Sequence, residues 1–175
     1  MDEGAGLDSA TELDPSAFGL IYERHRVSVY RYLRARMQSD EDALDLTADT
    51  FERAFGSLQR FRRRDGGVQA WLFRIARNAA IDAHRRRRPT IDLAGADAHL
   101  SRVAVEFARI EHERTEILDL VARLPNDQQE ALRLRYAGGL TAKEIGAVIG
   151  KSEGAVQKQI ERGLAALREA LHGRV

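Results

Sequence analysis

Apolar residues along this chain recur at spacings of three and four, which is the period of an amphipathic α-helix. In the N-terminal half, Ser39 precedes three consecutive acids, a pattern typical of a helix N-terminus because the acids complement the helix dipole. Pro89 ends the last apolar stretch of this half, since proline cannot continue a helix. The pattern predicts three helices, over residues 18–37, 40–59 and 69–88.

The C-terminal half shows a second series of helices. Pro125 ends a helix that contains residues 110–124, and Asn126 or Asp127 is expected to cap the next one, which reaches Tyr136. Gly138 and the glycine after it then end that helix. No segment shows the alternation of a β-strand.

Two further helices follow, joined by a tight turn. Thr141 and Glu144 form a capping box at the start of a short helix, Gly150 makes the turn, and Ser152 caps the last helix. The apolar positions of the last helix are expected to face inward: Val156, Ile160, Leu164, Leu167 and Leu171. This arrangement predicts a helix-turn-helix, and a helical pair that packs without binding DNA fits the same apolar pattern.

These elements predict an all-α protein with two small helical domains joined by a flexible linker. The expected divisions are an acidic disordered tail (1–14), a helical domain (15–88), the linker (89–112) and a helix-turn-helix domain (113–175).

Composition places the protein among intracellular globular proteins. The 175 residues include 43% hydrophobic and 31% charged residues, and no apolar run approaches the roughly 20 residues that span a bilayer. The first residues lack the basic start and apolar core of a secretory signal, and the chain has no cysteine. We therefore expect a cytoplasmic protein without membrane insertion or disulfides.

Acidic residues share one face of the second predicted helix. At about 100° per residue, Asp42, Asp45, Asp49 and Glu52 fall within roughly 80° of one another, with Leu46 beside them and exposed. The buried face is expected to be opposite: Leu44, Phe51, Ala54, Phe55 and Leu58. An acidic stripe beside an exposed leucine favours a basic protein partner, and a solvated charged face remains the alternative.

Arginine is concentrated between residues 60 and 88, where ten arginines stand against two acids although the net charge of the chain is only +1. On the third predicted helix, Trp71, Arg74, Asn78, Asp82 and Arg85 share one face, and the opposite face is apolar. Aromatic, amide and guanidinium groups stack bases and hold phosphates, so this surface predicts a nucleic-acid partner. Trp71 as a core aromatic is the alternative reading.

Candidate enzyme chemistry is missing from the sequence. The five histidines are scattered, at positions 25, 84, 99, 112 and 172, and no glycine-rich phosphate loop or metal-binding histidine pair is present. We expect no catalytic residue, no metal and no cofactor.

Three segments together resemble sigma factors of bacterial RNA polymerase in the extracytoplasmic-function (ECF) group. They are DALDLTADTFERAF, AWLFRIARNAAIDAHRRRR and LPNDQQEALRLRYAGGLTAKEIGAVIGKSEGAVQKQI. The resemblance implies a factor that binds core RNA polymerase, recognises the minus-10 and minus-35 promoter elements and melts the DNA, with an anti-sigma protein as a further partner that occludes the acidic stripe and the DNA face.

The resemblance also implies roles for named residues. It implies a polymerase-binding set of Asp42, Asp45, Leu46, Asp49 and Glu52. It implies a minus-10 set of Arg62, Arg63, Arg64, Trp71, Arg74, Asn78 and Arg85. It implies a minus-35 set of Lys151, Ser152, Glu153, Gln157, Lys158 and Arg162 on the last helix, where Gln and Glu suit base edges and Lys and Arg suit phosphates.

The chain departs from the family pattern in two places. The family's acidic helix usually carries one more carboxylate and an amide, and this chain has Leu44, Thr47 and Ala48 there instead. The last helix is less basic than usual because of Gln157 and its neighbours. Two alternatives remain. A regulator that binds operators alone fits LTAKEIGAVIG, which also resembles response-regulator C-terminal domains, and a non-catalytic protein-interaction module fits the charged faces.

Overall fold

The computed structural model describes residues 15–37, 39–62, 66–86 and 117–173 of the chain. All regular structure in these ranges is helical, which confirms the predicted all-α class. The predicted tail and linker lie outside the described residues, as do Arg63 and Arg64 of the predicted minus-10 set.

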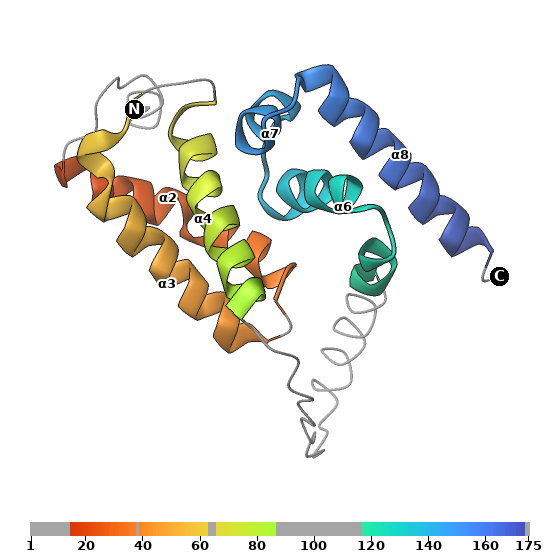
Figure 1. The fold of residues 1–175 in the computed structure, drawn as a ribbon, viewed down its shortest axis with the longest axis horizontal. Helices are drawn as coiled ribbons and strands as arrows, with labels where there is room; N and C mark the ends of the chain where they lie inside the picture. The colour runs from red at the N-terminus through yellow and green to blue at the C-terminus, as the bar shows by residue number, and fades with distance from the viewer. Residues whose placement is uncertain (1–14, 38, 63–65, 87–116, 174–175) are drawn as a thin grey trace, which may run out of the picture.

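Three long helices form the N-terminal half (Figure 1). A short 3₁₀ turn, η1 (Pro15–Ala17), precedes the first of them, and another, η2 (Leu58–Arg60), follows the second. The long helices are α2 (Phe18–Arg34), α3 (Asp40–Gly56) and α4 (Gly67–Arg86).

Three helix boundaries in this half differ from the prediction. The helix α2 ends at Arg34 and not at Met37, because the amides of Arg36 and Met37 both donate to the carbonyl of Leu33 in a closing turn. The helix α3 ends at Gly56 and not near Gln59, because Ser57 leaves the helical conformation, with φ −106° and ψ 4°, and the chain continues as η2. The helix α4 begins two residues earlier than predicted, at Gly67. Its start follows a tight turn in which Gly66 and Gly67 have φ angles of 93° and 63°, which glycine adopts without strain.

The buried face of α3 was predicted in the wrong phase. Phe51, Ala54 and Leu58 are buried as expected, but Leu44 and Phe55 are 58% and 55% exposed. Leu46 was predicted to be exposed and is instead 9% exposed, in the core. The physical reason is that Ala43, Leu46, Thr50 and Ala54 form the stripe at spacings of three and four that packs against α2 and α4.

The C-terminal half contains a helical segment at residues 117–122, a short helix that continues as a π-helix, and a helix-turn-helix. The short helix has no side-chain cap from Asn126 or Asp127, which was the prediction. Pro125 is its N-cap residue, and the carbonyl of Pro125 accepts hydrogen bonds from the amides of Gln128 and Gln129. The elements are α6 (Asn126–Leu132), η3 (Arg133–Ala137), α7 (Ala142–Ile149) and α8 (Glu153–His172).

The last helix buries its first half more deeply than its second. Val156 is fully buried, and Ile160, Leu164 and Leu167 are half-buried, but Leu171 is 50% exposed and so does not face inward as predicted. The burial follows from where α8 crosses α6, because only residues near the crossing are covered by the other helix. A Cβ on Gly163 would lie 2.9 Å from the Leu132 side chain, so the two helices meet there, and Leu171 lies two turns beyond the contact.

The two halves pack directly against each other. Figure 1 shows α7 and α6 beside α4, and the residues of α4 contact α7 while those of α2 contact η3. One hydrophobic core runs through this boundary, from Tyr32 and Phe73 on the N-terminal side to Leu134, Leu140 and Ile145 on the other.

Candidate protein and nucleic-acid interfaces

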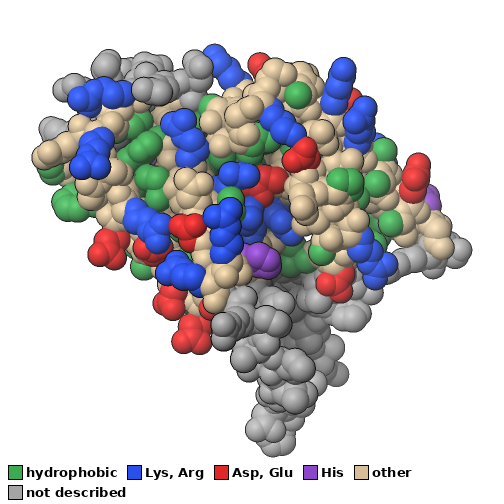
Figure 2. Space-filling model, viewed as in Figure 1, with side chains coloured by type: hydrophobic (Ala, Val, Ile, Leu, Met, Phe, Trp, Pro, Cys, Tyr) green, Lys and Arg blue, Asp and Glu red, His purple; other side chains and the backbone are tan. Residues whose placement is uncertain are grey.

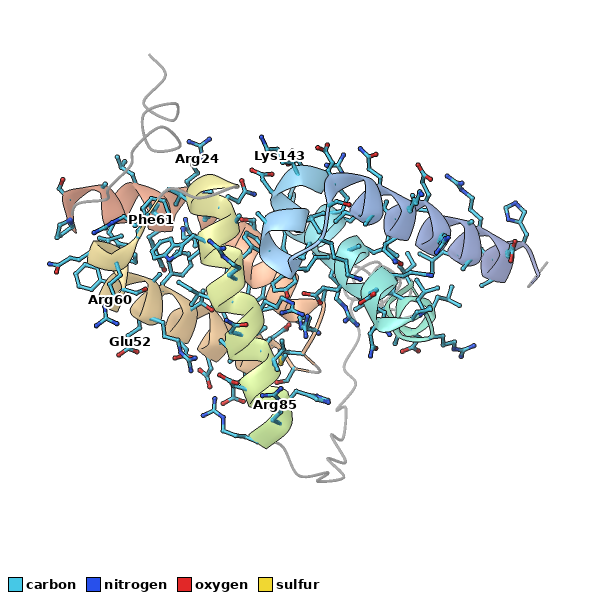
Figure 3. All side chains as sticks on the ribbon, turned by 45° about the horizontal axis from the view of Figure 1, so that its top comes forward. Arg24, Glu52, Arg60, Phe61, Arg85 and Lys143 are labelled. Atoms are coloured by element: carbon cyan, nitrogen blue, oxygen red, sulfur yellow. The ribbon has the colours of Figure 1, made fainter. Side chains whose placement is uncertain are left out.

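The acidic stripe of α3 is divided between structural and exposed carboxylates. At the helix start, the Asp42 carboxylate accepts a 2.5 Å hydrogen bond from the Ser39 hydroxyl, and the Asp42 amide donates a 3.1 Å hydrogen bond to the same hydroxyl. Asp49 pairs with Arg53 at 2.8 Å, and this hydrogen bond is the main cause that raises the pKa of Arg53. Asp45 and Glu52 are exposed, and Figure 3 shows Glu52 pointing away from the helices. The carboxylates best placed for a partner are therefore Asp45 and Glu52.

Two exposed apolar side chains flank these carboxylates, and the sequence analysis assigned both to the core. Around the axis of α3, Leu44 and Phe55 lie within about 20° of each other. Leu44 lies about 80° from Glu52, and Phe55 lies about 80° from Asp45. Phe55 is held in place by an edge-to-face contact with Phe18, with ring centroids 5.0 Å apart. With Leu46 in the core, the apolar part of this surface is Leu44 and Phe55.

The charge distribution is visible on the molecular surface (Figure 2). Asp and Glu side chains gather along α3, while Lys and Arg side chains gather over α4 and the adjoining edge of the C-terminal half. The helix α3 is thus richer in acids and α4 richer in bases, although Arg53 of α3 lies 3.7 Å from Asp82 of α4, so different partners suit the two surfaces.

Trp71 at the start of α4 is half-buried and held by an aromatic neighbour. Its ring meets that of Phe61 edge to face, with centroids 5.1 Å apart, and Phe61 is only 2% exposed. Phe61, labelled in Figure 3, directly follows η2 and thus contacts Trp71 from that side. Nearby, the guanidinium group of Arg62 donates to the carbonyls of Gln59 and Phe61, which orders the chain directly after η2.

The polar face of α4 is exposed over part of its length. Asn78 and Arg85 are exposed, and Arg74 is half-buried because it lines a pocket shared with the C-terminal half. The opposite face is buried as predicted at Leu72, Phe73, Ala76 and Ala80. The predicted residues therefore share the outer side of one helix, with Arg74 nearest the other half.

The helix-turn-helix has the local geometry that the sequence predicts. The Thr141 hydroxyl accepts a hydrogen bond from the amide of Glu144, and the Glu144 carboxylate accepts one from the amide of Thr141, which together form the capping box. Gly150 has a φ angle of 73° in the turn. The turn is tight, since a Cβ on Gly146 would lie 2.5 Å from the carbonyl oxygen of Lys151. Ser152 caps α8 by accepting a 3.3 Å hydrogen bond from the amide of Ala155.

The outer face of α8 presents the predicted minus-35 residues with one difference in environment. Ser152, Glu153, Gln157, Lys158 and Arg162 are exposed. Lys151 is half-buried and forms an ion pair with Asp127 of α6. Ser152 has a structural role as the cap, so Glu153, Gln157, Lys158 and Arg162 are the side chains most available to a partner.

Two kinds of site find no support in the part of the chain that the structure describes. Its His, Asp and Glu side chains form no group of three or more that could hold a metal ion. None of its helices combines the length and the apolar character that a membrane crossing requires.

Two family models match the chain. The model described as sigma-70 region 2 matches residues 21–90, and the one described as sigma-70, region 4 matches residues 114–167. The ECF RNA polymerase sigma factor SigD of Mycobacterium tuberculosis is 32% identical, with 97% of this chain and 85% of the relative covered. The ECF RNA polymerase sigma factor BldN of Streptomyces coelicolor is 33% identical over 94% of this chain, which spans 64% of that relative's length.

A solved structure agrees with these relatives. The chain is similar to CnrH, solved in complex with the cytosolic domain of CnrY, with a TM-score of 0.70 and 28% identity over 98% of this chain and 96% of that one. The matched regions coincide with the α3 and α4 surfaces and with the helix-turn-helix described above. The chain belongs to the ECF family of RNA polymerase sigma factors.

Proposed function

We propose that the protein initiates transcription by binding core RNA polymerase and directing it to promoters with minus-10 and minus-35 elements. The observation that carries this proposal is the presence of three separate surfaces on one chain of this family. They are the acidic and apolar face of α3, the polar face of α4 and the outer face of α8. A regulator that binds operators alone needs only the last of these.

The α3 surface suits a basic protein partner with an apolar groove. Asp45 and Glu52 supply exposed negative charge, which speeds association with a basic surface. Leu44 and Phe55 supply the apolar contact area that gives affinity once the partner is bound. We assign this surface to core RNA polymerase.

The α4 surface suits promoter DNA at the minus-10 element. Arg74 and Arg85 are positioned to hold phosphates, and Asn78 carries a donor and an acceptor for base edges. Trp71 presents a partly exposed ring beside Phe61, on which an unstacked base could pack. The promoter duplex melts there if an unpaired base bound to the protein has a lower free energy than the same base paired in the duplex.

The α8 surface suits duplex DNA at the minus-35 element. The N-terminal residues of a recognition helix read base edges in the major groove, and Glu153 and Gln157 stand there. Lys158 and Arg162 are also exposed, about 100° and 140° further around α8 than Gln157, and suit phosphates beside the groove.

A cytoplasmic inhibitor is a further proposed partner. CnrH, which this chain resembles along almost its whole length, was solved in complex with the cytosolic domain of another protein. A similar domain could cover the α3 surface here by contacting Leu44 and Phe55. Affinity capture with wild-type protein and with Leu44→Ala should recover this inhibitor only with the wild type. Recovery of polymerase alone would contradict the proposal.

Reconstituted transcription tests the main function. Purified chain and core RNA polymerase are combined with genomic DNA fragments, and transcript start sites are mapped. We expect start sites that share two upstream elements, and their loss in the double variant Asp45→Lys, Glu52→Lys. The matched control reverses two exposed acids of the C-terminal half, Asp119→Lys and Glu169→Lys, and should retain the transcripts. Tight sequence-specific binding to duplex DNA without polymerase, with no transcripts, would overturn the proposal in favour of a lone regulator.

A further inference from the structure

A pocket of about 620 Å³ lies between α4 and the helix-turn-helix. Its charged lining residues are Arg74 of α4, Lys143 of α7, Lys151 of the turn and Glu153 of α8. The other lining residues are Gly146, Ala147 and Gly150, so small and charged residues make up the lining that the structure describes. Pockets of about this volume hold small ligands, and a lining without aromatic or large apolar side chains favours a polar ligand.

Positive charge in this pocket exceeds negative charge. Three cations line it against one carboxylate, that of Glu153. In the described ranges, Arg74 and Lys143 form no ion pair and no side-chain hydrogen bond. Lys151 pairs with Asp127, but this pair is partly exposed to solvent, and such pairs are weak enough to be exchanged for another anion. The concave surface therefore attracts an anion.

The distribution of lysine points to phosphate as that anion. The chain has three lysines, at positions 143, 151 and 158, and the first two line this pocket. A lysine ammonium group is a compact charge that binds phosphate, and the guanidinium group of Arg74 can hold two phosphate oxygens at once. Gly150 has no side chain to keep a phosphate group away from the backbone. Three cations around one pocket suit a ligand that carries several phosphates.

Close packing bounds the pocket at one edge. A Cβ on Gly66 would lie 2.9 Å from the Cβ of Ala147, which is itself a lining residue. The turn before α4 thus touches α7 directly at this edge, and no passage for a polymer remains there. The pocket therefore suits a small anion better than a nucleic-acid strand that runs through it.

We propose that this pocket binds a small ligand through a chain of phosphate groups, as found in a nucleoside triphosphate or in inorganic tripolyphosphate. Arg74 holds the phosphates from α4, and Lys143 holds them from the start of α7 (Figure 3). Lys151 joins them when the ligand replaces Asp127. The base of a nucleotide contributes little, because the described lining offers no ring for it to stack on. Neither polymerase nor DNA takes part, so the site does not depend on the proposed function.

Calorimetric titration of the full chain tests the site. Tripolyphosphate is added at an ionic strength of about 0.15 M, without divalent cations that would neutralise the phosphates. We expect one ligand per chain with a Kd on the order of 0.1 mM or tighter. ATP and GTP should bind equally well, and AMP, with one phosphate, at least about tenfold more weakly. Absence of saturable binding, or equal binding of AMP and tripolyphosphate, would overturn the proposal.

Substitutions of cations separate the pocket from general attraction to a basic protein. Arg74→Gln and Lys143→Gln should each weaken tripolyphosphate binding by about tenfold or more, because each removes a charge-assisted hydrogen bond. The matched controls are Arg168→Gln and Lys158→Gln, which remove exposed cations outside the pocket and should leave the Kd unchanged. Circular dichroism checks that each variant is folded. Equal losses in all four variants would overturn the proposal.

Chemical protection tests the same site in the unsubstituted chain, so it is decisive even if a variant misfolds. Lys143 and Lys158 are both exposed, and both should react with a limiting amount of an acetylating reagent. With tripolyphosphate at about ten times its Kd, the reaction at Lys143 should slow by about tenfold, because roughly nine in ten pockets are occupied. The reaction at Lys158 should not change. Mass spectrometry measures both, and equal protection of the two lysines, or none at Lys143, would overturn the proposal.

Discussion

The hydroxyl of Tyr32 donates a hydrogen bond to Glu130, which lies 98 residues further along the chain. Burial, and after it the negative charge of Glu130, raise the pKa of the Tyr32 phenol far above its ordinary value. The phenol therefore stays protonated and remains a donor at any physiological pH. This contact links α2 to α6 and fixes how the two halves meet.

Tyr32→Phe should lower the free energy of unfolding by about 1.5–3 kcal/mol, because hydrogen bonds to buried charged groups are worth about that much. The matched control is Tyr30→Phe, whose hydroxyl donates a 3.3 Å hydrogen bond to Asp40 on the exposed surface. We expect that variant to change the free energy by less than about 0.5 kcal/mol. Urea denaturation followed by circular dichroism measures both, and equal losses would contradict the role of the buried contact.

The raised pKa of Tyr32 predicts a loss of stability in alkali. In the unfolded chain the phenol titrates near its ordinary value of 10.0, whereas in the folded chain it stays protonated to higher pH. The neutral donor thus contributes its full stability below about pH 10, and the contribution falls as the pH rises above that value. The stability difference between wild type and Tyr32→Phe should shrink from about pH 10 upward in urea titrations. A difference that is constant through this range would show that Tyr32 titrates equally in both states.

Local signals predicted the helix-turn-helix well. The capping box at Thr141, the turn at Gly150 and the cap at Ser152 each depend on residues within a few positions of one another, and the structure confirms all three. The Tyr32–Glu130 contact has no such signal, because nothing near either residue indicates the partner. Its two sides come together only when both halves fold and pack.

The α3 surface shows why a helical period can be recognised while its buried face is misplaced. Leu44 and Phe55 are large and apolar, so hydrophobicity alone assigned them to the core. The actual core face uses Ala43 and Thr50, which are small enough for α2 and α4 to approach closely. Thr50 is compatible with burial because its hydroxyl donates to the carbonyl of Leu46 at 2.6 Å. Which face is buried depends on the shape of the neighbours, and the sequence does not contain that directly.

Leu44→Ala should weaken binding to core polymerase by tenfold or more, because apolar anchors near the centre of an interface carry much of its affinity. Leu44 is 58% exposed, so the fold should be unaffected. The control is Leu20→Ala, which removes an equally large side chain that is 50% exposed on α2. Fluorescence anisotropy with labelled protein and core polymerase measures both affinities. A greater loss for Leu20→Ala would move the proposed interface from α3 to α2.

Two glycines of α8 should respond oppositely to alanine. A Cβ on Gly163 would lie 2.9 Å from the Leu132 side chain, so Gly163→Ala should destabilise the protein by about 1–3 kcal/mol through overpacking. A Cβ on Gly154 meets nothing within 4 Å, so Gly154→Ala should stabilise it by about 0.5 kcal/mol through helix propensity. Thermal denaturation of both variants gives the two signs. Stabilisation in both cases would mean that α6 and α8 do not pack closely at Gly163.

Arg74→Gln should weaken promoter binding by the complex with core polymerase and also make binding less sensitive to salt. A phosphate contact releases counterions, so its loss reduces the slope of log affinity against log salt by about one, and by somewhat less on single-stranded DNA. The control is Arg168→Gln, which removes an exposed arginine near the end of α8, outside the proposed surfaces. Filter binding at several salt concentrations, on two promoters with different minus-10 sequences, gives slope and specificity together. An affinity loss on one promoter alone, with an unchanged slope, would instead place Arg74 on a base edge, because a phosphate contact weakens binding to every sequence alike.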